Sequence, residues 1–321
     1  MAGERRYLGV GVESTFGTLV SAQGYLDATV IGLGTPDTPQ LFYPGVSGDR
    51  QISVAAPGNY APRGQIDVGI DDTYIGYLLQ SFFGSYAVAG ASPYTHTFKV
   101  GGAVEVLPSV SLRDGKGVTE RQFAGMTGER LTLSCNAQSP WLMGQGQFVG
   151  KIDTLGSLDS SGKTFASDYY TFRELAVSVA SGSVSTKVRG FDVTLENGLD
   201  VEGGIRASSR FPAELPLNET NVSGSIVLDF DDTAEYTRFW GNASGAQATD
   251  GSAVELQLLF TKGSNTFEIL IPQATWTAIA DPTEGRNRIV QTVNFTGLRG
   301  GSEDTVLQVE LVNTTASYAA A

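Results

Sequence analysis

The sequence predicts an all-β protein of two tandem domains, each a β-sandwich or barrel with one short helix. Three observations predict this fold class: a composition suited to short strands, alternating apolar and polar residues, and an internal repeat. Of 321 residues, 40 are Gly and 41% are hydrophobic, which suits many short strands joined by turns. The 3 Trp, 16 Phe and 12 Tyr residues can fill the interiors of such sheets.

The internal repeat divides the chain into halves. Residues 64–73 (GQIDVGIDDT) match residues 224–233 (GSIVLDFDDT) at Gly, Ile and the closing Asp-Asp-Thr. Later in each half comes a segment that ends in Phe-x-Gly, at 147–150 and at 294–297. We interpret this as an ancient duplication of one domain of about 130–150 residues, a common domain size. Chance similarity between Gly-rich strands is the alternative.

The first domain is predicted over residues 1–155. Within it, the segment 34–63 is rich in Pro and aromatic residues and is too long for an idle connection in a compact domain. Exposed aromatic, Arg and Pro residues favour contacts with a neighbouring molecule, although a solvated loop is the alternative. The candidate contact residues of this segment are Phe42, Tyr43, Arg50, Tyr60 and Arg63.

A helix is predicted after each Asp-Asp-Thr, with Asp72 and Asp232 as caps, because a carboxylate there accepts hydrogen bonds from free backbone N–H groups. The acid pairs could instead bind Ca²⁺ or serve a glycosidase. Their identical position before a helix favours capping. Apolar residues on one face of the first helix would pack against its sheet: Ile75, Leu78, Leu79, Phe82 and Phe83.

Residues 156–172, rich in Ser, Gly and Asp, are predicted to be a linker. The second domain is predicted over residues 173–321. Its loop at 203–223 is the counterpart of 34–63 and carries the candidate contact residues Arg206, Arg210 and Phe211. Alternation of apolar and polar residues predicts a hairpin over 254–271 and a C-terminal strand over 307–311, with an arm after it.

Charge and residue counts argue against several functions. The 34 acidic residues outnumber 21 basic ones, for a net charge of −13, whereas a protein that grips phosphates needs a basic face. One Cys and one His exclude a disulfide framework and most His-based catalysis. His96 lies in an alternating segment and is expected to be structural, and no Gly-x-Ser-x-Gly elbow accompanies it. We therefore expect no enzyme activity, no cofactor and no metal.

No stretch approaches 18 apolar residues, so no membrane span is expected. The N-terminal segment lacks the apolar core of a signal peptide, and assembly inside a cell is expected.

Several segments, taken in order, carry a family resemblance: 7–17 (YLGVGVESTFG), 64–67 (GQID), 82–84 (FFG), 93–98 (PYTHTF), 128–134 (GERLTLS), 148–151 (FVGK) and 311–314 (LVNT). Their order and spacing resemble the tail tube proteins, also called major tail proteins, of siphoviruses, the long-tailed viruses of bacteria and archaea. The similarity is greatest to the larger type with two fused tube domains. No single segment is diagnostic.

The resemblance implies a structural virion protein that self-assembles into stacked rings, the tail tube through which viral DNA is delivered. Subunits would join their sheets into one barrel around a lumen, so a two-domain chain would need three copies, a pseudo-sixfold trimer. The segments 34–63 and 203–223 would then contact the next ring, helped by terminal arms. Implied partners are other copies of the chain, a tape measure protein in the lumen, and tail terminator and tail-tip proteins. Assembly would take place in the host cytoplasm and the product would be part of the virion tail.

DNA would pass through such a lumen without specific binding. Three chains of charge −13 give a ring of about −39, which disfavours adhesion of phosphates. Asp67 and Asp229, each opposite the apolar face of a predicted strand, are expected to face the lumen. The alternative function is a carbohydrate-binding β-sandwich module on a virion or cell surface, with Tyr43 and Tyr60 stacking on sugars.

Overall fold

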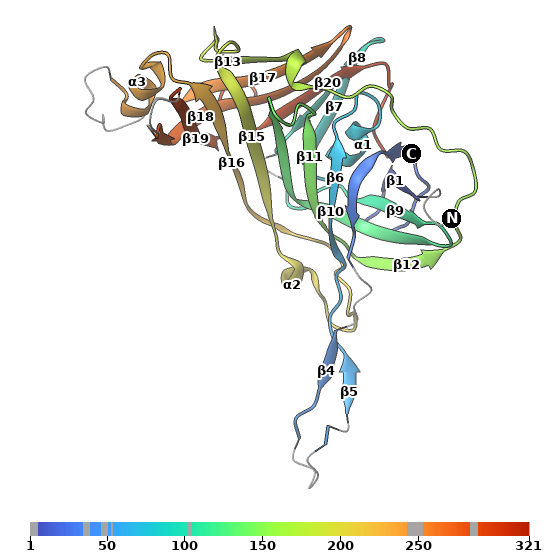
Figure 1. Ribbon diagram of the computed structural model, residues 1–321. Helices are drawn as coiled ribbons and strands as arrows, with labels where there is room; N and C mark the ends of the chain where they lie inside the picture. Colours follow the sequence, from blue (N-terminus) through green and yellow to red (C-terminus); the bar gives the residue numbers. More distant parts are fainter. Residues whose placement is uncertain are drawn as a thin grey trace.

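The computed structural model describes residues 6–34, 39–45, 51–52, 54–101, 104–242, 253–282 and 288–320. Most of these residues lie in antiparallel strands (Figure 1), which confirms the all-β prediction. The elements in chain order are β1 Arg6–Val12, β2 Gly24–Leu26, β3 Ala28–Gly32, β4 Gln40–Phe42, β5 Ala55–Pro57, β6 Arg63–Gly69, α1 Ile75–Leu79, β7 Ser85–Gly90, β8 Tyr94–Lys99, β9 Val110–Lys116, β10 Glu120–Asn136, β11 Met143–Val149, β12 Ile152–Gly156, the 3₁₀ turn Phe172–Glu174, β13 Leu175–Val179, β14 Gly182–Ser183, β15 Val188–Leu199, α2 Val201–Gly204, β16 Leu217–Asp229, α3 Ala234–Trp240, β17 Val254–Lys262, β18 Asn265–Ala280, β19 Val290–Leu298 and β20 Gln308–Asn313.

Eight of these strands form one broad antiparallel sheet, here called the wide sheet. Its order is β3-β6-β11-β10-β15-β16-β19-β18. Figure 1 shows β16 beside β15, and β11 beside β6, within this sheet. Side chains alternate between its two faces, as the pleat requires. Ile66 and Ile226 are buried on the core face, whereas Asp67 and Ser225 lie on the other, polar face.

Two smaller sheets cover the core face. The first covering sheet has the order β2-β1-β9-β10-β12. The second has the order β14-β13-β17-β18-β20-β8-β7. Both β10 and β18 belong to two sheets, because each pairs in a covering sheet along its first half and in the wide sheet along its second half.

The same pairing order occurs twice in the wide sheet. Strand β11 lies between β6 and β10, and β19 lies between β16 and β18. Gly64 pairs with Phe148 in the first group, and Gly224 pairs with Phe295 in the second. These pairs join the segments that the sequence repeat singled out.

One hairpin crosses between the halves of the chain. Strands β7 and β8 follow α1 in the first half, but β8 pairs along six residues with β20, near the C-terminus. Strands from both predicted domains therefore share the second covering sheet. The domain boundaries 1–155 and 173–321, and the duplication, stay predictions.

The loop expected over 203–223 is shorter than the sequence analysis predicted. Helix α2 overlaps its start, and β16 already begins at Leu217. The first residues of β16, Leu217–Ser223, are mostly polar and pair with an equally polar stretch of β15. A polar strand has no apolar alternation, so its sequence looks like a loop.

The C-terminal segment after β20 folds back over α1. Tyr318 is fully buried, and its ring packs edge-on against Tyr77 at 4.8 Å and His96 at 4.6 Å between centroids. Its hydroxyl donates to the carbonyl of Thr73 at 2.6 Å. The predicted C-terminal arm is thus packed against its own chain over the residues that the structure describes.

Among the described residues, none of the helices has the length and apolar character needed to cross a membrane.

Candidate assembly surfaces

The polar face of the wide sheet is covered by short polar side chains that bond to one another. Thr132 and Thr194 face each other across β10 and β15, with 3.0 Å between their Oγ1 atoms. Asp192 accepts a hydrogen bond from Ser225. Asp67 accepts one from the Gln65 amide at 2.8 Å. These polar groups are therefore satisfied within the chain, and this part of the face is hydrophilic.

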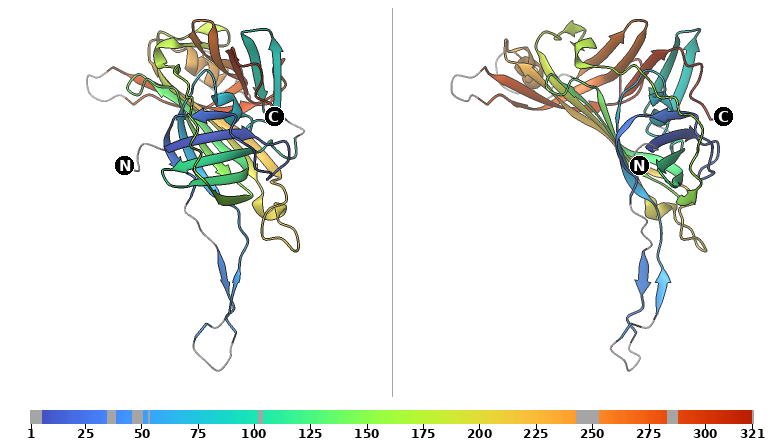
Figure 2. Two further views of the ribbon diagram at one scale, coloured as in Figure 1. Left: turned by 90° about the vertical axis from the view of Figure 1, so that its right-hand side faces the viewer. Right: turned by 45° about the vertical axis from the view of Figure 1, so that its right-hand side comes forward.

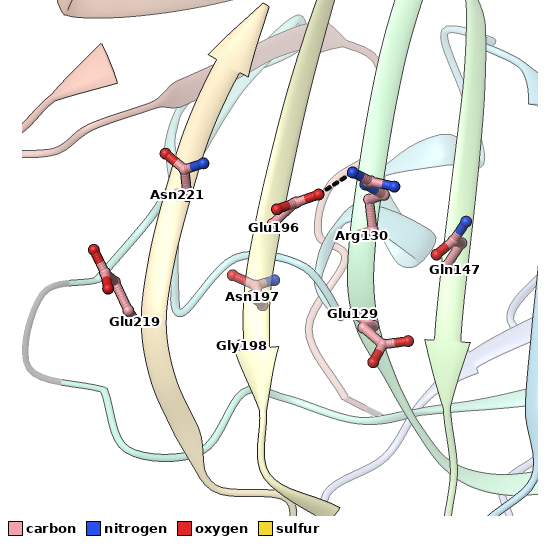
Figure 3. Close-up of a pocket in the computed structure, with 8 residues that line it drawn as sticks. All are labelled: Glu129, Arg130, Gln147, Glu196, Asn197, Gly198, Glu219 and Asn221. Atoms are coloured by element: carbon pink, nitrogen blue, oxygen red, sulfur yellow. Dashed lines mark ion pairs between the residues drawn. The ribbon is translucent and has the colours of Figure 1, made fainter. Parts of the chain in front are cut away.

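The lower part of this face holds a depression of about 660 Å³ where β10 meets β15 (Figure 3). Three carboxylates line it, from Glu129, Glu196 and Glu219, and Figure 3 shows them on three different strands. Arg130 forms an ion pair with Glu196, and Glu129 pairs with the nearby Arg63 at 3.0 Å. The carboxylates that line the depression outnumber its one Arg, a balance that disfavours phosphate binding.

The two acids predicted to face a lumen lie on this polar face, but in different settings. Asp67 is half-buried, and its bond to Gln65 is to an uncharged group. The carboxylate of Asp229 is paired with Arg189 at 2.5 Å and with Arg288 at 3.0 Å. The charge of Asp229 is therefore largely balanced within the chain. Their position in a lumen stays a prediction.

A hairpin of β4 and β5 projects from the body of the molecule (Figures 1 and 2). All residues of both strands are exposed. Phe42 is 58% exposed and Tyr43 is 70% exposed. Exposed apolar side chains gathered on one projection indicate a contact surface. Arg50, the remaining candidate from this part of the loop, lies outside the described residues.

Other candidate contact residues bond within the chain. Arg210 lies over the rings of Tyr60 and Phe211, which pack edge to face with centroids 6.1 Å apart. The Tyr60 N–H donates to the Arg210 carbonyl at 2.8 Å. Arg206 forms an ion pair with Glu214. The predicted loops 34–63 and 203–223 are therefore joined to each other at the base of the hairpin.

An aromatic patch that the sequence analysis missed lies beyond the other end of β6. Trp141 is 55% exposed and packs edge-on against Tyr169, with 6.3 Å between ring centroids. It precedes β11, whose first residue pairs with Gly69, the last residue of β6. A Trp in the Ser-Pro-Trp turn between two strands was the available signal.

The first helix is capped by a different carboxylate from the one predicted. Asp71 Oδ1 accepts the N–H groups of Thr73, Tyr74 and Ile75. Asp72 instead accepts a hydrogen bond from the Asn265 amide at 2.6 Å. The prediction of Asp72 as the cap was therefore wrong, because neighbouring acids cannot be told apart without the backbone path.

The second predicted cap, Asp232, accepts the Ala234 N–H at 2.9 Å and pairs with Lys187. The ammonium of Lys187 lowers the pKa of the Asp232 carboxyl. Burial has the opposite effect at Asp71, whose pKa is raised to about 6.

The single His and the single Cys are both buried. His96 bonds through its ring nitrogens to the Tyr86 hydroxyl at 2.9 Å and to the Thr315 carbonyl at 2.8 Å, and burial lowers its pKa. Burial raises the pKa of Cys135 to about 12, which makes the reactive thiolate rare. Within the described ranges, no three His, Cys, Asp or Glu side chains are grouped to hold a metal ion.

Comparison with known proteins identifies the family of this chain. No curated protein matched the chain in a search by sequence. The family model described as phage tail tube protein matches residues 3–297, nearly the whole chain. This protein therefore belongs to the phage tail tube protein family, the structural proteins that assemble into the tube of the virion tail.

Proposed function

We propose that three copies of this chain close into a pseudo-sixfold ring, and that stacked rings form the tube through which viral DNA is delivered. The observation that carries this proposal is the order of the strands in the wide sheet. Its strands fall into two series of four, β3-β6-β11-β10 and β15-β16-β19-β18, joined by antiparallel pairing of β10 with β15. One chain then supplies two of six equivalent wall segments, which is what a duplicated tube domain would contribute.

The polar face of the wide sheet would line the channel. Its hydroxyl, amide and carboxylate groups are already bonded to neighbours, and the acids of its depression outnumber the bases. Duplex DNA would meet a surface that neither binds bases nor neutralises phosphates. Specific binding of DNA is not part of the proposed role, and neither is enzyme activity.

The projecting hairpin would contact the next ring. Phe42 and Tyr43 remain exposed for this contact, whereas Tyr60, Arg210 and Phe211 fix the base of the hairpin. Head-to-tail stacking of this kind extends without limit, as a tube requires. A tape measure protein in the channel, and terminator and tip proteins at the tube ends, complete the proposed partners, with assembly in the host cytoplasm.

The carbohydrate-binding alternative loses one of its two aromatic residues. The Tyr60 ring packs against Phe211, and its hydroxyl donates to Asp153. That leaves Tyr43 without Tyr60 as a free partner for a sugar.

The test is the number of chains in a ring. Cryo-electron microscopy of the purified full-length protein, with mass photometry of short assemblies, should give rings of three chains with six similar wall segments. Rings of six chains, or only monomers at every concentration and salt condition, would contradict the proposal. A Phe42→Ser/Tyr43→Ser double variant should form single rings that no longer stack. The matched control is Val118→Ser, at an exposed site (85%) away from the hairpin, which should stack normally.

A further inference from the structure

The wide sheet ends in two strands that each have one free side. Strand β3 pairs with β6, and residues 275–280 of β18 pair with β19. In the part of the chain that the structure describes, no strand pairs with the other side of either segment. Strand β3 (ATVIG) carries no charge and no Pro, the features that protect exposed edges from unwanted pairing. This edge is built to accept another strand.

The β-bulges show which strand of the first series corresponds to which strand of the second. In β10 the register shifts at Glu129, and in β18 it shifts at Thr277. The two bulges lie at the same place relative to the neighbouring strand, which is β11 for β10 and β19 for β18. Gly128 pairs with Phe148 just before the first bulge, and Trp276 pairs with Phe295 just before the second. Strand β18 therefore occupies in the second series the position of β10 in the first.

A second pair of bulges gives the other correspondence. Strand β3 shifts register at Thr29, opposite the Val68–Asp67 step of β6. Strand β15 shifts at Arg189, opposite the Leu228–Val227 step of β16. Because Val68 and Leu228 are equivalent in the repeat, β3 occupies the position of β15. Bulges are specific local features, so two coincident bulges fix the alignment to the residue.

The junction between β10 and β15 is consequently a template for the contact between chains. In that junction Thr132 pairs with Thr194, and Ser134 pairs with Asp192. Position 132 corresponds to Ala280 and position 134 to Pro282; position 192 corresponds to Gly32 and position 194 to Gly34. We infer that Ala280–Pro282 of one chain pairs antiparallel with Gly32–Gly34 of the next, with Pro282 opposite Gly32. This inference rests on the proposed ring and adds the identity and register of its seam.

The seam has fewer contacts than the internal junction. Ala, Gly and Pro replace the facing Thr, Ser and Asp side chains on the polar face, so the chains would meet mainly through backbone groups. The internal junction also has a second connection, since β8 pairs with β20 in the covering sheet. Strand β8 belongs to the β7–β8 hairpin, which lies within the 30 residues (80–109) between α1 and β9. In the second half only 13 residues (241–253) separate α3 from β17, too few for a hairpin of the same length. The ring would therefore separate into intact chains at this seam under mild denaturation.

Cysteine cross-linking tests the register. A Gly32→Cys/Pro282→Cys variant of the full chain, assembled and mildly oxidised, should give covalent dimers and trimers in non-reducing gels. A side chain at Gly32 has room, since the nearest atom is the Gln65 carbonyl oxygen at 3.4 Å. Gly34 is unsuitable because its φ is +75°. The native Cys135 is buried and stays in place.

Two matched variants calibrate the result. Ser134→Cys/Asp192→Cys places the same pair within one chain and should form a disulfide without forming oligomers. Val30→Cys/Ala280→Cys is four residues out of register, about 13 Å along the strand, beyond the reach of a disulfide. We expect at least tenfold more cross-linked product from the in-register pair than from this control.

The outcomes separate the seam from the ring. Three-chain rings in microscopy with no cross-link between positions 32 and 282, or with equal cross-linking of the out-of-register pair, would overturn the proposed register and leave the ring intact. Absence of rings would overturn both. If the variants do not fold, hydrogen exchange of the wild-type protein decides. The amides of Leu33 and Asp281 should become at least tenfold slower on ring formation, and unchanged exchange would overturn the seam.

Discussion

The two helix regions of this protein occupy equivalent places after β6 and β16, yet they are stabilised differently. The side chains of Ile75, Leu78 and Leu79 in α1 are buried, and the C-terminal segment covers the helix. In α3 the buried residue is Glu235, which accepts a hydrogen bond from the Trp276 indole at 2.9 Å and pairs with Arg238. Burial raises the pKa of Glu235. A helix at the same place in the topology can thus be held either by buried apolar side chains, as in α1, or by a buried hydrogen-bonded carboxylate, as in α3.

The difference has a cause in the covering elements. After β20, residues 314–320 pack on α1 through Tyr318. The corresponding stretch after β12 is the predicted linker, which leads into β13 instead of covering α3. Its Tyr170 is fully buried beside Phe260 and Phe267. The helix of the first half is therefore covered by the C-terminal segment, whereas the segment after β12 connects the two halves and, over the described residues, leaves α3 without such a cover.

The largest expected effect tests this cover. Tyr318→Ala removes a fully buried ring and its bond to the Thr73 carbonyl, and should lower the free energy of unfolding by about 4 kcal/mol. Trp240→Ala, which removes a half-buried ring stacked on Tyr236 in α3, should cost about 1–2 kcal/mol. Urea denaturation followed by circular dichroism measures both. Equal losses would mean that the covering residue Tyr318 contributes no more to α1 than the helix's own Trp240 contributes to α3.

The next effect concerns pH. The Asp71 pKa of about 6 lies above its unfolded value of 3.8, so the folded chain holds this proton more tightly. The stability that it contributes is complete below about pH 4 and is lost as pH rises through about 6, a change of about 3 kcal/mol. Asp71→Asn, which keeps a capping oxygen, should remove this loss.

The matched variant for pH is Asp232→Asn. Lys187 lowers the Asp232 pKa, so its contribution has the opposite sign: it is present above the unfolded pKa and lost as pH falls. Denaturation curves between pH 3 and 7 compare the two variants with the wild type. A wild-type minus Asp71→Asn difference that does not vary with pH would refute the proposed role of burial at Asp71.

A smaller effect is expected beneath α1. Gly128 lies directly against the Phe82 ring, so an added methyl group would overlap the ring. Gly128→Ala should cost about 2 kcal/mol by overpacking. Gly162→Ala is the control, since nothing lies within 4 Å of its added Cβ. At the equivalent place in the second half stands Trp276, so only the first half should show this sensitivity; a neutral Gly128→Ala would show that Phe82 can move aside.

The smallest effect compares the caps. Asp71→Ala removes an acceptor of three backbone N–H groups and should cost about 1–2 kcal/mol, whereas Asp232→Ala removes an acceptor of one and should cost about 0.5 kcal/mol. Thermal unfolding at pH 4, where the Asp71 carboxyl of the folded chain is still protonated, is the measurement. A larger loss at Asp232 would reverse the order that the hydrogen bonds indicate.

Local patterns in the sequence predicted much of this fold. The alternation over 254–271 predicted a hairpin, and β17 and β18 confirm it. The repeat at 64–73 and 224–233 led directly to β6 and β16. Alternation fails where neither face is apolar, as in the first residues of β16. The pairing of β8 with β20 could not be predicted either, because it joins residues about 210 positions apart and has no local signal.

The assembly surfaces were predicted less completely. Phe42 and Tyr43 are exposed as their composition suggested, but Tyr60 and Phe211 pack against each other within the chain. Tyr318 stands alone among Ser, Thr and Ala residues, so no periodicity marked it as buried. The free edges of β3 and β18 could not be predicted from the sequence, because they follow from the pairing of all the other strands.

The long strands β10 and β18 have a mechanical consequence. Each runs without interruption from a covering sheet into the wide sheet, so a single backbone links the two layers twice in every chain. A force that bends one layer is carried covalently into the other, and this continuity resists sliding of the layers. Such a wall would respond to pressure as one elastic shell.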